Sequence, residues 1–263
     1  MVFWFRDGKN YDFKMATKAD TPGDITLEAN NEHVQITRKD PHEACKDLGI
    51  FIAPDGNMKQ QFEYCLGKAK TMKTTIAASA LTRNEADIFH HSRYMGWTRY
   101  FLPIATFSMK ECNAIQSQVN MALLPKVGFN RHMPHAVIYG PRSLGGFGRH
   151  DLYTEQVIEH LRLTMLEIRK ETTAGKLLLI ELDTVQLISG FKTPVLTTVK
   201  DVRLKLPATR ITYMWSAVSK LKLQVEIWDQ WFPLPKTVGD RSIMEVVLIK
   251  HRGDQKRIFP RPI

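Results

Sequence analysis

The spacing of apolar residues changes at Pro54-Asp55-Gly56, and this change limits the possible folds more than any other feature of the sequence. Before it, the segments DITLEA and HVQITR alternate apolar and polar residues around Asn30-Asn31, as the strands of a hairpin do. After it, apolar residues recur every three or four positions, which is the spacing of one face of a long helix: Met58, Phe62, Cys65, Ala69, Met72, Ile76 and Ala80. This order predicts an α+β protein in which helix dominates, with a short β-rich N-terminal portion followed by a helical bundle.

Two more strand signals precede the change in spacing. The turn residues Asp7-Gly8 lie between VFWF and YDFKM and predict another hairpin. The short apolar run DLGIFI, which the turn at Pro54 closes, predicts one further strand. These strands are few, so we expect their edges to remain open unless another segment pairs with them.

Local signals set the limits of the next helices. The segment Thr82–Glu85 is a capping box that should start a second helix, and Pro103 should end it. The segment Ser108–Glu111 is another capping box, and the third helix that it starts should end at Pro125. The buried face of the second helix would hold Phe89, Tyr94, Trp97 and Phe101. Several lysines of the first helix lie off its apolar stripe, toward solvent or a ligand: Lys59, Lys68, Lys70 and Lys73.

The C-terminal half continues with helical patterns. Asp151 can cap a fourth helix, Gly175 should separate it from a fifth, and Gly190 should end that fifth helix. A further helix is predicted over residues 209–223. Large aromatics near it could stack on bases, but core packing is the favoured role: Trp215, Trp228 and Trp231. The predicted domains are a β-rich portion (1–56), a helical domain (57–190), a mixed extension (191–250) and a disordered tail (251–263).

The charge of the chain allows a polyanionic partner. The 263 residues carry a net charge of +10, and such an excess either attracts nucleic acid or only aids solubility. The cysteines are Cys45, Cys65 and Cys112, an odd and widely spaced set that implies reduced thiols. The N-terminus does not read as a signal peptide, and no apolar run is long enough to cross a membrane. We therefore expect an intracellular protein, cytoplasmic or nuclear.

The residues themselves indicate no catalytic centre. Two-metal nucleotidyl transfer requires clustered carboxylates, and the sequence contains no Asp-Asp pair. No serine stands in a G-x-S-x-G turn. The pairs His132/His135 and His42/Cys45 have the gap of metal ligands, but neither has a second pair to complete a zinc site. The sequence therefore predicts no catalytic residue, no metal ligand and no cofactor held by this chain.

A glycine-rich basic segment lies in the middle of the chain, between two helical patterns. It reads LLPKVGFNRHMPHAVIYGPRSLGGFGRHDLYTEQ and spans residues 123–156. A glycine turn that runs into a helix N-terminus can offer backbone amides to a phosphate, with arginines beside them. The alternative is a tight connection between packed helices, with solvated arginines. The basic residues are Lys126, Arg131, Arg142 and Arg149, and the glycines are Gly140, Gly145, Gly146 and Gly148.

Six segments in fixed order carry a family resemblance: FWFRDGKNYDF, TPGDI, KDLGIFIAPDGN, LLPKVGFNR, YGPRSLGGFGRHDLYTEQ and GKLLLIELDTVQLISG. Together they resemble a non-LTR-like retrotransposon reverse transcriptase, in the region downstream of the catalytic palm motif. The strand Lys46–Ile50 is similar to the K-x-L-G-[VI] segment that ends the palm. The glycine-rich segment is similar to a helical, thumb-like region, and the resemblance extends to about Glu245.

The resemblance implies an RNA-directed DNA polymerase from a transposable element. Such enzymes use two divalent magnesium ions, which palm aspartates of a [YF]-x-D-D motif hold. That motif lies upstream of the region matched here, so we expect a C-terminal fragment that does not polymerise alone. The palm-edge strands at the N-terminus would then pair with palm and fingers segments that this chain lacks.

The expected function is binding of an RNA/DNA primer–template duplex through its phosphate backbone, since a thumb must hold a duplex of any sequence. The expected binding side chains are Lys126, Arg131, Arg142 and Arg149, and the expected phosphate-binding amides are those of Gly145, Gly146 and Gly148. Three alternatives remain open: a non-enzymatic helical protein-interaction module, a decayed relic without activity, and a truncated gene model of a full polymerase.

Overall fold

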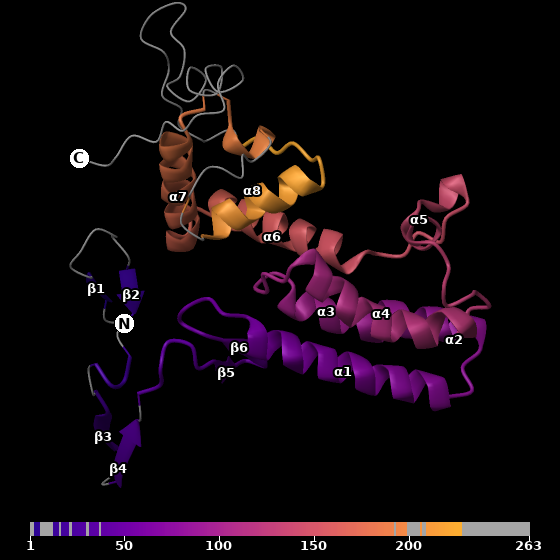
Figure 1. Cartoon of the computed structure of the whole chain (residues 1–263), viewed down its shortest axis with the longest axis horizontal. Coiled ribbons are helices and arrows are strands. Elements are labelled where there is room, and N and C mark those ends of the chain that lie inside the picture. Colours follow the sequence, from indigo (N-terminus) through magenta and orange to yellow (C-terminus); the bar gives the residue numbers. More distant parts are fainter. Residues whose placement is uncertain are drawn as a thin grey trace, which may run out of the picture. The chain divides into compact units, whose positions relative to one another are not determined.

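The computed structural model describes residues 3–5, 13–15, 17–20, 23–29, 32–36, 38–191, 193–198, 206 and 209–227. Helices make up most of this part of the chain, and strands occur only before residue 53 (Figure 1). The predicted class, α+β with helix dominant, is confirmed. The chain forms two compact units: the first comprises residues 1–101 and 105–153, and the second comprises residues 102–104 and 154–263. This boundary falls inside the segment 57–190, which the sequence assigned to one helical domain.

The strands form three separate antiparallel hairpins. Strand β1 (Phe3–Phe5) pairs with β2 (Phe13–Met15), and β3 (Ile25–Ala29) pairs with β4 (Glu32–Ile36), as predicted. The Asp7-Gly8 turn lies outside the described residues. The third hairpin is β5 (Cys45–Asp47) with β6 (Ile50–Ile52).

The third hairpin corrects the interpretation of Lys46–Ile50 as one strand. Leu48 and Gly49 have positive φ angles of 46° and 90°, which is the backbone of a two-residue hairpin turn. Tyr100 donates a hydrogen bond from its hydroxyl to the Leu48 carbonyl and so holds this turn. The segment therefore reverses the chain, and only Ile50–Ile52 continues as the strand predicted from DLGIFI.

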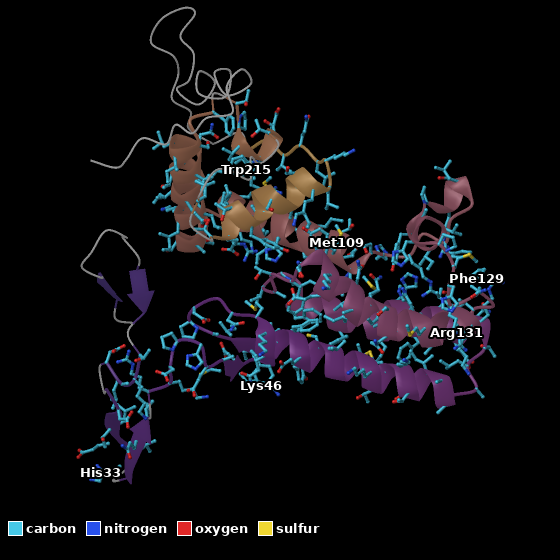
Figure 2. All side chains as sticks on the ribbon, in the orientation of Figure 1. His33, Lys46, Met109, Phe129, Arg131 and Trp215 are labelled. Carbon is cyan, nitrogen blue, oxygen red and sulfur yellow. The ribbon has the colours of Figure 1, made fainter. Side chains whose placement is uncertain are left out.

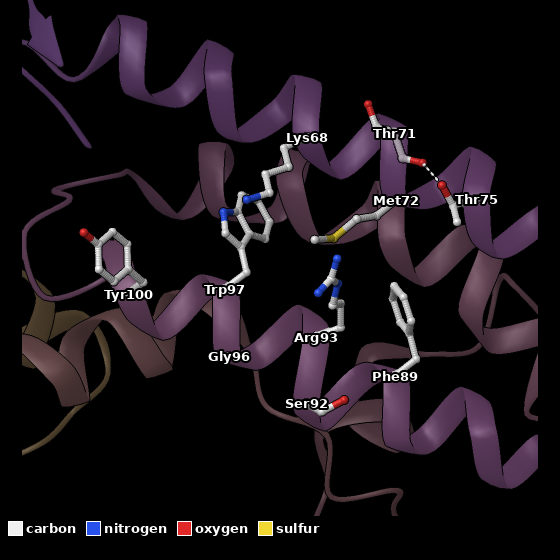
Figure 3. A pocket seen from close by; sticks show the side chains of 10 residues that line it. All are labelled: Lys68, Thr71, Met72, Thr75, Phe89, Ser92, Arg93, Gly96, Trp97 and Tyr100. Atoms are coloured by element: carbon white, nitrogen blue, oxygen red, sulfur yellow. Dashed lines mark hydrogen bonds between the residues drawn. The ribbon is translucent and has the colours of Figure 1, made fainter. Parts of the chain in front are cut away.

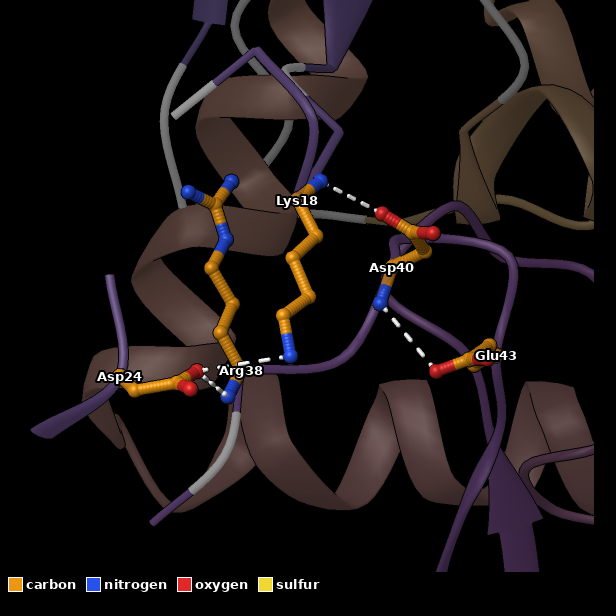
Figure 4. A network of polar contacts seen from close by, with 5 residues as sticks. All are labelled: Lys18, Asp24, Arg38, Asp40 and Glu43. Carbon is orange, nitrogen blue, oxygen red and sulfur yellow. Dashed lines mark hydrogen bonds and ion pairs between the residues drawn. The ribbon is translucent and has the colours of Figure 1, made fainter. Parts of the chain in front are cut away.

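Polar contacts tie the loops around the second hairpin together (Figure 4). The Lys18 amide donates to Asp40 Oδ1 at 2.6 Å, and the Arg38 amide donates to Asp24 Oδ1 at 2.9 Å. Lys18 Nζ lies 3.7 Å from Asp24 Oδ1, and the Asp40 amide donates to Glu43 Oε2 at 3.3 Å. All these groups are partly exposed, so they fix the course of the loop rather than supply much stability.

The first unit is built on two long helices, α1 (Lys59–Ala78) and α4 (Met109–Lys126), which pack against each other. The predicted stripe of α1 supplies the buried Cys65, Ala69 and Ile76, which lie in one core with buried residues of α4: Ile115, Val119 and Leu123. Both capping boxes, at Thr82–Glu85 and Ser108–Glu111, are present as predicted. Pro125 does not end α4 but occupies its last turn, one residue before the helix ends.

The predicted second helix is a continuous run of three segments. It comprises α2 (Arg83–Ile88), the π-helical turns of η1 (Phe89–Met95) and α3 (Gly96–Phe101). Of its four predicted core aromatics, Tyr94 and Phe101 are fully buried, whereas Phe89 and Trp97 are only partly buried. The short helix α5 (His135–Tyr139) and the 3-10 turn η2 (Arg142–Leu144) complete this unit.

The second unit contains most of α6 (Leu152–Arg169), with α7 (Thr173–Ser189), the 3-10 turn η3 (Val195–Thr197) and α8 (Arg210–Lys220). Helix α6 begins directly after Asp151, as expected. Trp215 is fully buried and donates from Nε1 to the Thr198 carbonyl at 2.8 Å, which confirms its core role. Trp228, Trp231 and the tail over 251–263 lie outside the described residues. No helix in the described segments is both long and apolar enough to span a bilayer.

Gly175 does not separate α6 from α7, contrary to the prediction. The break lies at residues 170–172, and Thr172 caps α7 by accepting a hydrogen bond from the Gly175 amide at 3.0 Å. Gly175 lies in the first turn of α7, against the end of α6. A Cβ there would lie 2.1 Å from the Glu167 carbonyl oxygen. The glycine is therefore required by the close approach of two helices, not by a chain break.

A candidate nucleic-acid interface

The four basic residues predicted from the sequence have different environments. Lys126 donates from Nζ to the carbonyl of Ser79 at 2.6 Å. Ser79 is the C-terminal cap of α1, so this ammonium satisfies a helix-end carbonyl and offsets the helix dipole. Arg131 is exposed at the surface (Figure 2). Arg142 is also exposed, and its Nε donates to the Phe147 carbonyl at 3.3 Å.

Arg149 is a buried residue with a partner inside the protein. It is 8% exposed, and its Nη2 lies 2.9 Å from Asp87 Oδ1. Burial lowers the pKa of the guanidinium, whereas the Asp87 carboxylate raises it. The Arg149–Asp87 pair joins the glycine-rich segment to α2, so this arginine holds the fold together and does not present its charge to a ligand.

The glycine loop folds back on itself. The three amides predicted to bind phosphate already donate to carbonyls within the loop: Gly145 to Arg142 at 3.1 Å, Gly146 to Pro141 at 3.0 Å and Gly148 to Gly140 at 2.8 Å. They are satisfied in this conformation and offer no donor to a phosphate. A Cβ on Gly146 would lie 2.2 Å from the Gly140 carbonyl oxygen. The glycines therefore support the alternative interpretation of this segment, a tight connection between helices in which the backbone passes very close to itself.

Aromatic stacking also holds this loop in place. The rings of Phe129 and Phe147 are stacked with their centroids 3.7 Å apart, and the Arg83 guanidinium lies 5.6 Å from the centroid of Phe129. Phe129 thus contacts both Phe147, later in the loop, and Arg83, at the start of α2. Of the four predicted basic side chains, the two at the surface, Arg131 and Arg142, remain able to meet a large anion.

A groove elsewhere in the first unit combines positive charge with aromatic surface (Figure 3). It lies between one face of α1 and the η1–α3 run, and its volume is about 650 Å³. This is within the range of about 300–1,000 Å³ that is usual for ligand sites. Ten described residues line it, and none of these ten is acidic: Lys68, Thr71, Met72, Thr75, Phe89, Ser92, Arg93, Gly96, Trp97 and Tyr100.

Lys68 and Arg93 are the two cations of the groove, one from each wall. Lys68 Nζ lies 5.0 Å from the ring centroid of Trp97, in a cation–π contact. Trp97 is also packed against Phe101, with ring centroids 5.2 Å apart, so that the indole is held in place while part of it faces the groove. Arg93 is exposed and projects from η1 between Phe89 and Trp97 (Figure 3).

The hydroxyl groups of the groove are already used as donors. Thr71 donates to the Gly67 carbonyl at 3.2 Å, Thr75 to Thr71 at 3.0 Å and Ser92 to Ile88 at 2.6 Å. The groove therefore meets a ligand mainly with two cationic side chains and three aromatic ones. Such a surface suits an anion that carries a flat, apolar group.

Burial on the opposite side of η1 positions these side chains. His90, Tyr94 and Met95 are almost completely buried, whereas Phe89, Ser92 and Arg93 face the groove. Both ring nitrogens of His90 and the Tyr94 hydroxyl are without a partner among the described residues. Burial, then the nearby charges of Arg149, His91 and His150, lower the pKa of His90 to about 3. The imidazole is therefore neutral at physiological pH and contributes as a packed ring.

One residue of this groove could be predicted from the sequence. It placed Lys68 off the apolar stripe of α1, toward solvent or a ligand, but it assigned Trp97 and Phe89 to the core. The groove needs α1 and η1 side by side, and the π-helical turns of η1 have no simple sequence signal. Of the described residues, no three His, Cys, Asp or Glu side chains lie together as metal ligands would.

Comparisons with protein-family models, with curated proteins and with solved structures found no match to this chain.

Proposed function

We propose that this chain binds nucleic acid through the phosphate backbone, without sequence preference and without a reaction of its own. The observation that carries the proposal is the groove between α1 and η1–α3, where Lys68 and Arg93 flank aromatic side chains and none of the ten lining residues is acidic. Cations beside a surface free of carboxylates attract phosphates irrespective of the bases that they join.

The charge of the whole chain supports the same partner. A net charge of +10 raises the local concentration of a polyanion and speeds its encounter with the protein. The exposed Arg131 and Arg142 add two cations in the first unit. We propose a primer–template duplex of RNA and DNA as the natural ligand, in keeping with the resemblance to the palm-end and thumb-like region of retroelement reverse transcriptases.

This proposal changes the residues expected to bind. Lys68 and Arg93 take the place of Lys126 and Arg149, whose side chains are engaged within the protein. The amides of Gly145, Gly146 and Gly148 become structural, because each already donates inside the loop. Arg131 and Arg142 remain in the proposed binding set.

The test compares two double variants with equal charge loss. Lys68→Ala with Arg93→Ala removes both groove cations, and the matched control, Lys59→Ala with Lys110→Ala, removes two exposed lysines that do not line the groove. Affinity for a labelled RNA/DNA duplex is measured over a range of salt concentrations. We expect the groove variant alone to lower the slope of log K against log[salt] by about one for each lost phosphate contact. Equal slopes in the two double variants would refute the groove as the binding site.

A protein-interaction module is the second candidate, and one observation favours it. Helix α7 exposes a row of large apolar side chains at helical spacing, each at least half exposed: Leu177, Ile180, Leu187 and Ile188. Exposed apolar rows of this kind mark protein contacts. Replacing Ile180 and Leu187 by Lys should abolish such a contact and leave nucleic-acid affinity unweakened, which separates the two candidates.

A further inference from the structure

We infer that the groove between α1 and η1–α3 holds an unpaired base of a single-stranded nucleic-acid segment, stacked on Trp97, with its phosphates on Lys68 and Arg93. This inference rests on the proposed function and names the part of the ligand that the groove takes. Binding of duplex phosphates uses the two cations of the groove but not its aromatic side chains, and the inference assigns a role to those side chains.

The first argument is the order of side chains along one wall of the groove. Phe89, Arg93, Trp97 and Tyr100 follow one another at spacings of four, four and three residues along η1 and α3, and all four line the groove (Figure 3). Arg93 thus stands between aromatic rings along one side of this helical run, so that a base and a phosphate can be met from the same wall. Proteins that bind single strands without sequence preference combine these two kinds of side chain.

The second argument is the accessibility of base faces. In a duplex, each base is covered by its neighbours in the stack, so its flat face cannot meet a side chain. An unpaired base can turn out and lie on an aromatic ring. Aromatic side chains in a basic groove therefore favour a single-stranded segment over a duplex.

The third argument is the state of Trp97. The indole is fixed from behind by Phe101 and Tyr94, with ring centroids 5.2 and 6.3 Å away. Lys68, a long and flexible side chain, places its ammonium 5.0 Å from the indole centroid. An arriving base would displace this ammonium from the ring, and the lysine would then meet the phosphate of the same nucleotide. The site thus needs a side-chain rotation only.

The fourth argument is the space beside Trp97. Gly96 lines the groove with helical φ and ψ angles of −59° and −41°, and a Cβ built on it meets no atom within 4 Å. The helix therefore does not require glycine at this position. The absence of a side chain here leaves the groove open next to the indole.

Gly96 also provides a test that does not endanger the fold. Gly96→Leu fills the groove next to Trp97, retains Lys68 and Arg93, and replaces glycine in a helix by a better helix former. The matched control is Gly67→Leu in α1, which is likewise helical and also has nothing within 4 Å of an added Cβ, but does not line the groove.

The probes are a labelled oligo(dT) of roughly 12 nucleotides, which is within known single-strand site sizes, and a labelled RNA/DNA duplex. Fluorescence anisotropy gives the affinity of each protein for each probe. We expect Gly96→Leu to weaken oligo(dT) binding by about tenfold or more, as loss of one stacked base does. Duplex affinity should change less than about twofold, and Gly67→Leu should match the wild type with both probes.

The outcomes distinguish failure of the stacking site from failure of the proposed function. Unchanged oligo(dT) affinity in Gly96→Leu would overturn the stacking site, and salt-dependent duplex binding would still support the proposed function. An equal loss of affinity for both probes would also overturn it, because filling the space beside Trp97 would then hinder a stacked duplex as much as an unpaired base. Failure of the wild type to bind either probe would refute the inference and the proposed function together.

Discussion

His90 should make the protein less stable as the pH falls, and His90→Phe should remove the contribution of this residue to that dependence. The His90 side chain is 1% exposed, and burial is the main reason that its pKa is lowered from 6.5 to about 3. In the unfolded chain, His90 therefore binds a proton below about pH 6.5, whereas in the folded protein it binds one only below about pH 3. In this window the unfolded state binds more protons, so stability falls with falling pH by up to about 1.4 kcal/mol per unit. Between pH 7 and pH 5 the loss from His90 is about 2 kcal/mol.

Phenylalanine keeps the ring in contact with Tyr94, whose centroid lies 5.6 Å away, and removes the two ring nitrogens that have no partner among the described residues. At pH 7 the variant should be more stable by about 1 kcal/mol, because an unsatisfied buried polar group is gone. Urea unfolding followed by circular dichroism at pH 7 and pH 5 measures both effects. His132→Phe, at an exposed position, is the control and should lose as much stability as the wild type. An equal loss in His90→Phe and the wild type would refute the reasoning.

Other predictions address the loop, the cysteines and a helix end. Gly146→Ala should destabilise the protein by about 1–3 kcal/mol in urea unfolding, since its Cβ would lie 2.2 Å from a backbone oxygen; a neutral effect would contradict the close approach. In the native protein, the exposed Cys45 should react with a thiol reagent, whereas Cys65 and Cys112 should react only after unfolding. Burial raises the pKa of Cys65 to about 12 and that of Cys112 further still, so rapid labelling of all three would argue against the core. Lys126→Met should cost about 1 kcal/mol by leaving the Ser79 carbonyl without its donor, and it should not weaken nucleic-acid binding.

Features that depend on neighbours in the sequence were predictable. The middle of the apolar stripe of α1, the capping boxes at Thr82 and Ser108, and the end of α7 at Gly190 all follow from local patterns and are present. The two ends of the predicted stripe, Met58 and Ala80, lie outside α1. The hairpin of β3 and β4 also followed from alternation around Asn30-Asn31. These signals gave the class and most helix limits.

Features that depend on contacts between distant segments were not predictable. The amides of the glycine loop looked free in the sequence, because nothing there shows that Gly148 folds back onto Gly140. The charge of Arg149 looked available, because Asp87, its partner, lies far away in the sequence. Gly175 read as a chain break, but it is required by the approach of α7 to the Glu167 carbonyl.

Most residues of the candidate groove could not be predicted from the sequence either. Trp97 was assigned to a core face from helical spacing, since periodicity cannot distinguish a buried ring from one at the edge of a groove. Phe89, Arg93 and Trp97 share one face by their spacing of four residues, and the burial of His90, Tyr94 and Met95 on the other side leaves that face toward the groove. Lys68 and Arg93, which face the same groove from two helices, could be brought together only by the tertiary structure.

The most direct test of the central claim is the salt dependence of duplex binding by the wild-type protein. Affinity is measured for two RNA/DNA duplexes of unrelated sequence, from about 50 to about 200 mM salt, the range over which counterion release is large. If at least the two groove cations contact phosphates, affinity should fall about tenfold or more over this range, and equally for both duplexes. Binding that is absent, independent of salt, or restricted to one of the two sequences would contradict the account.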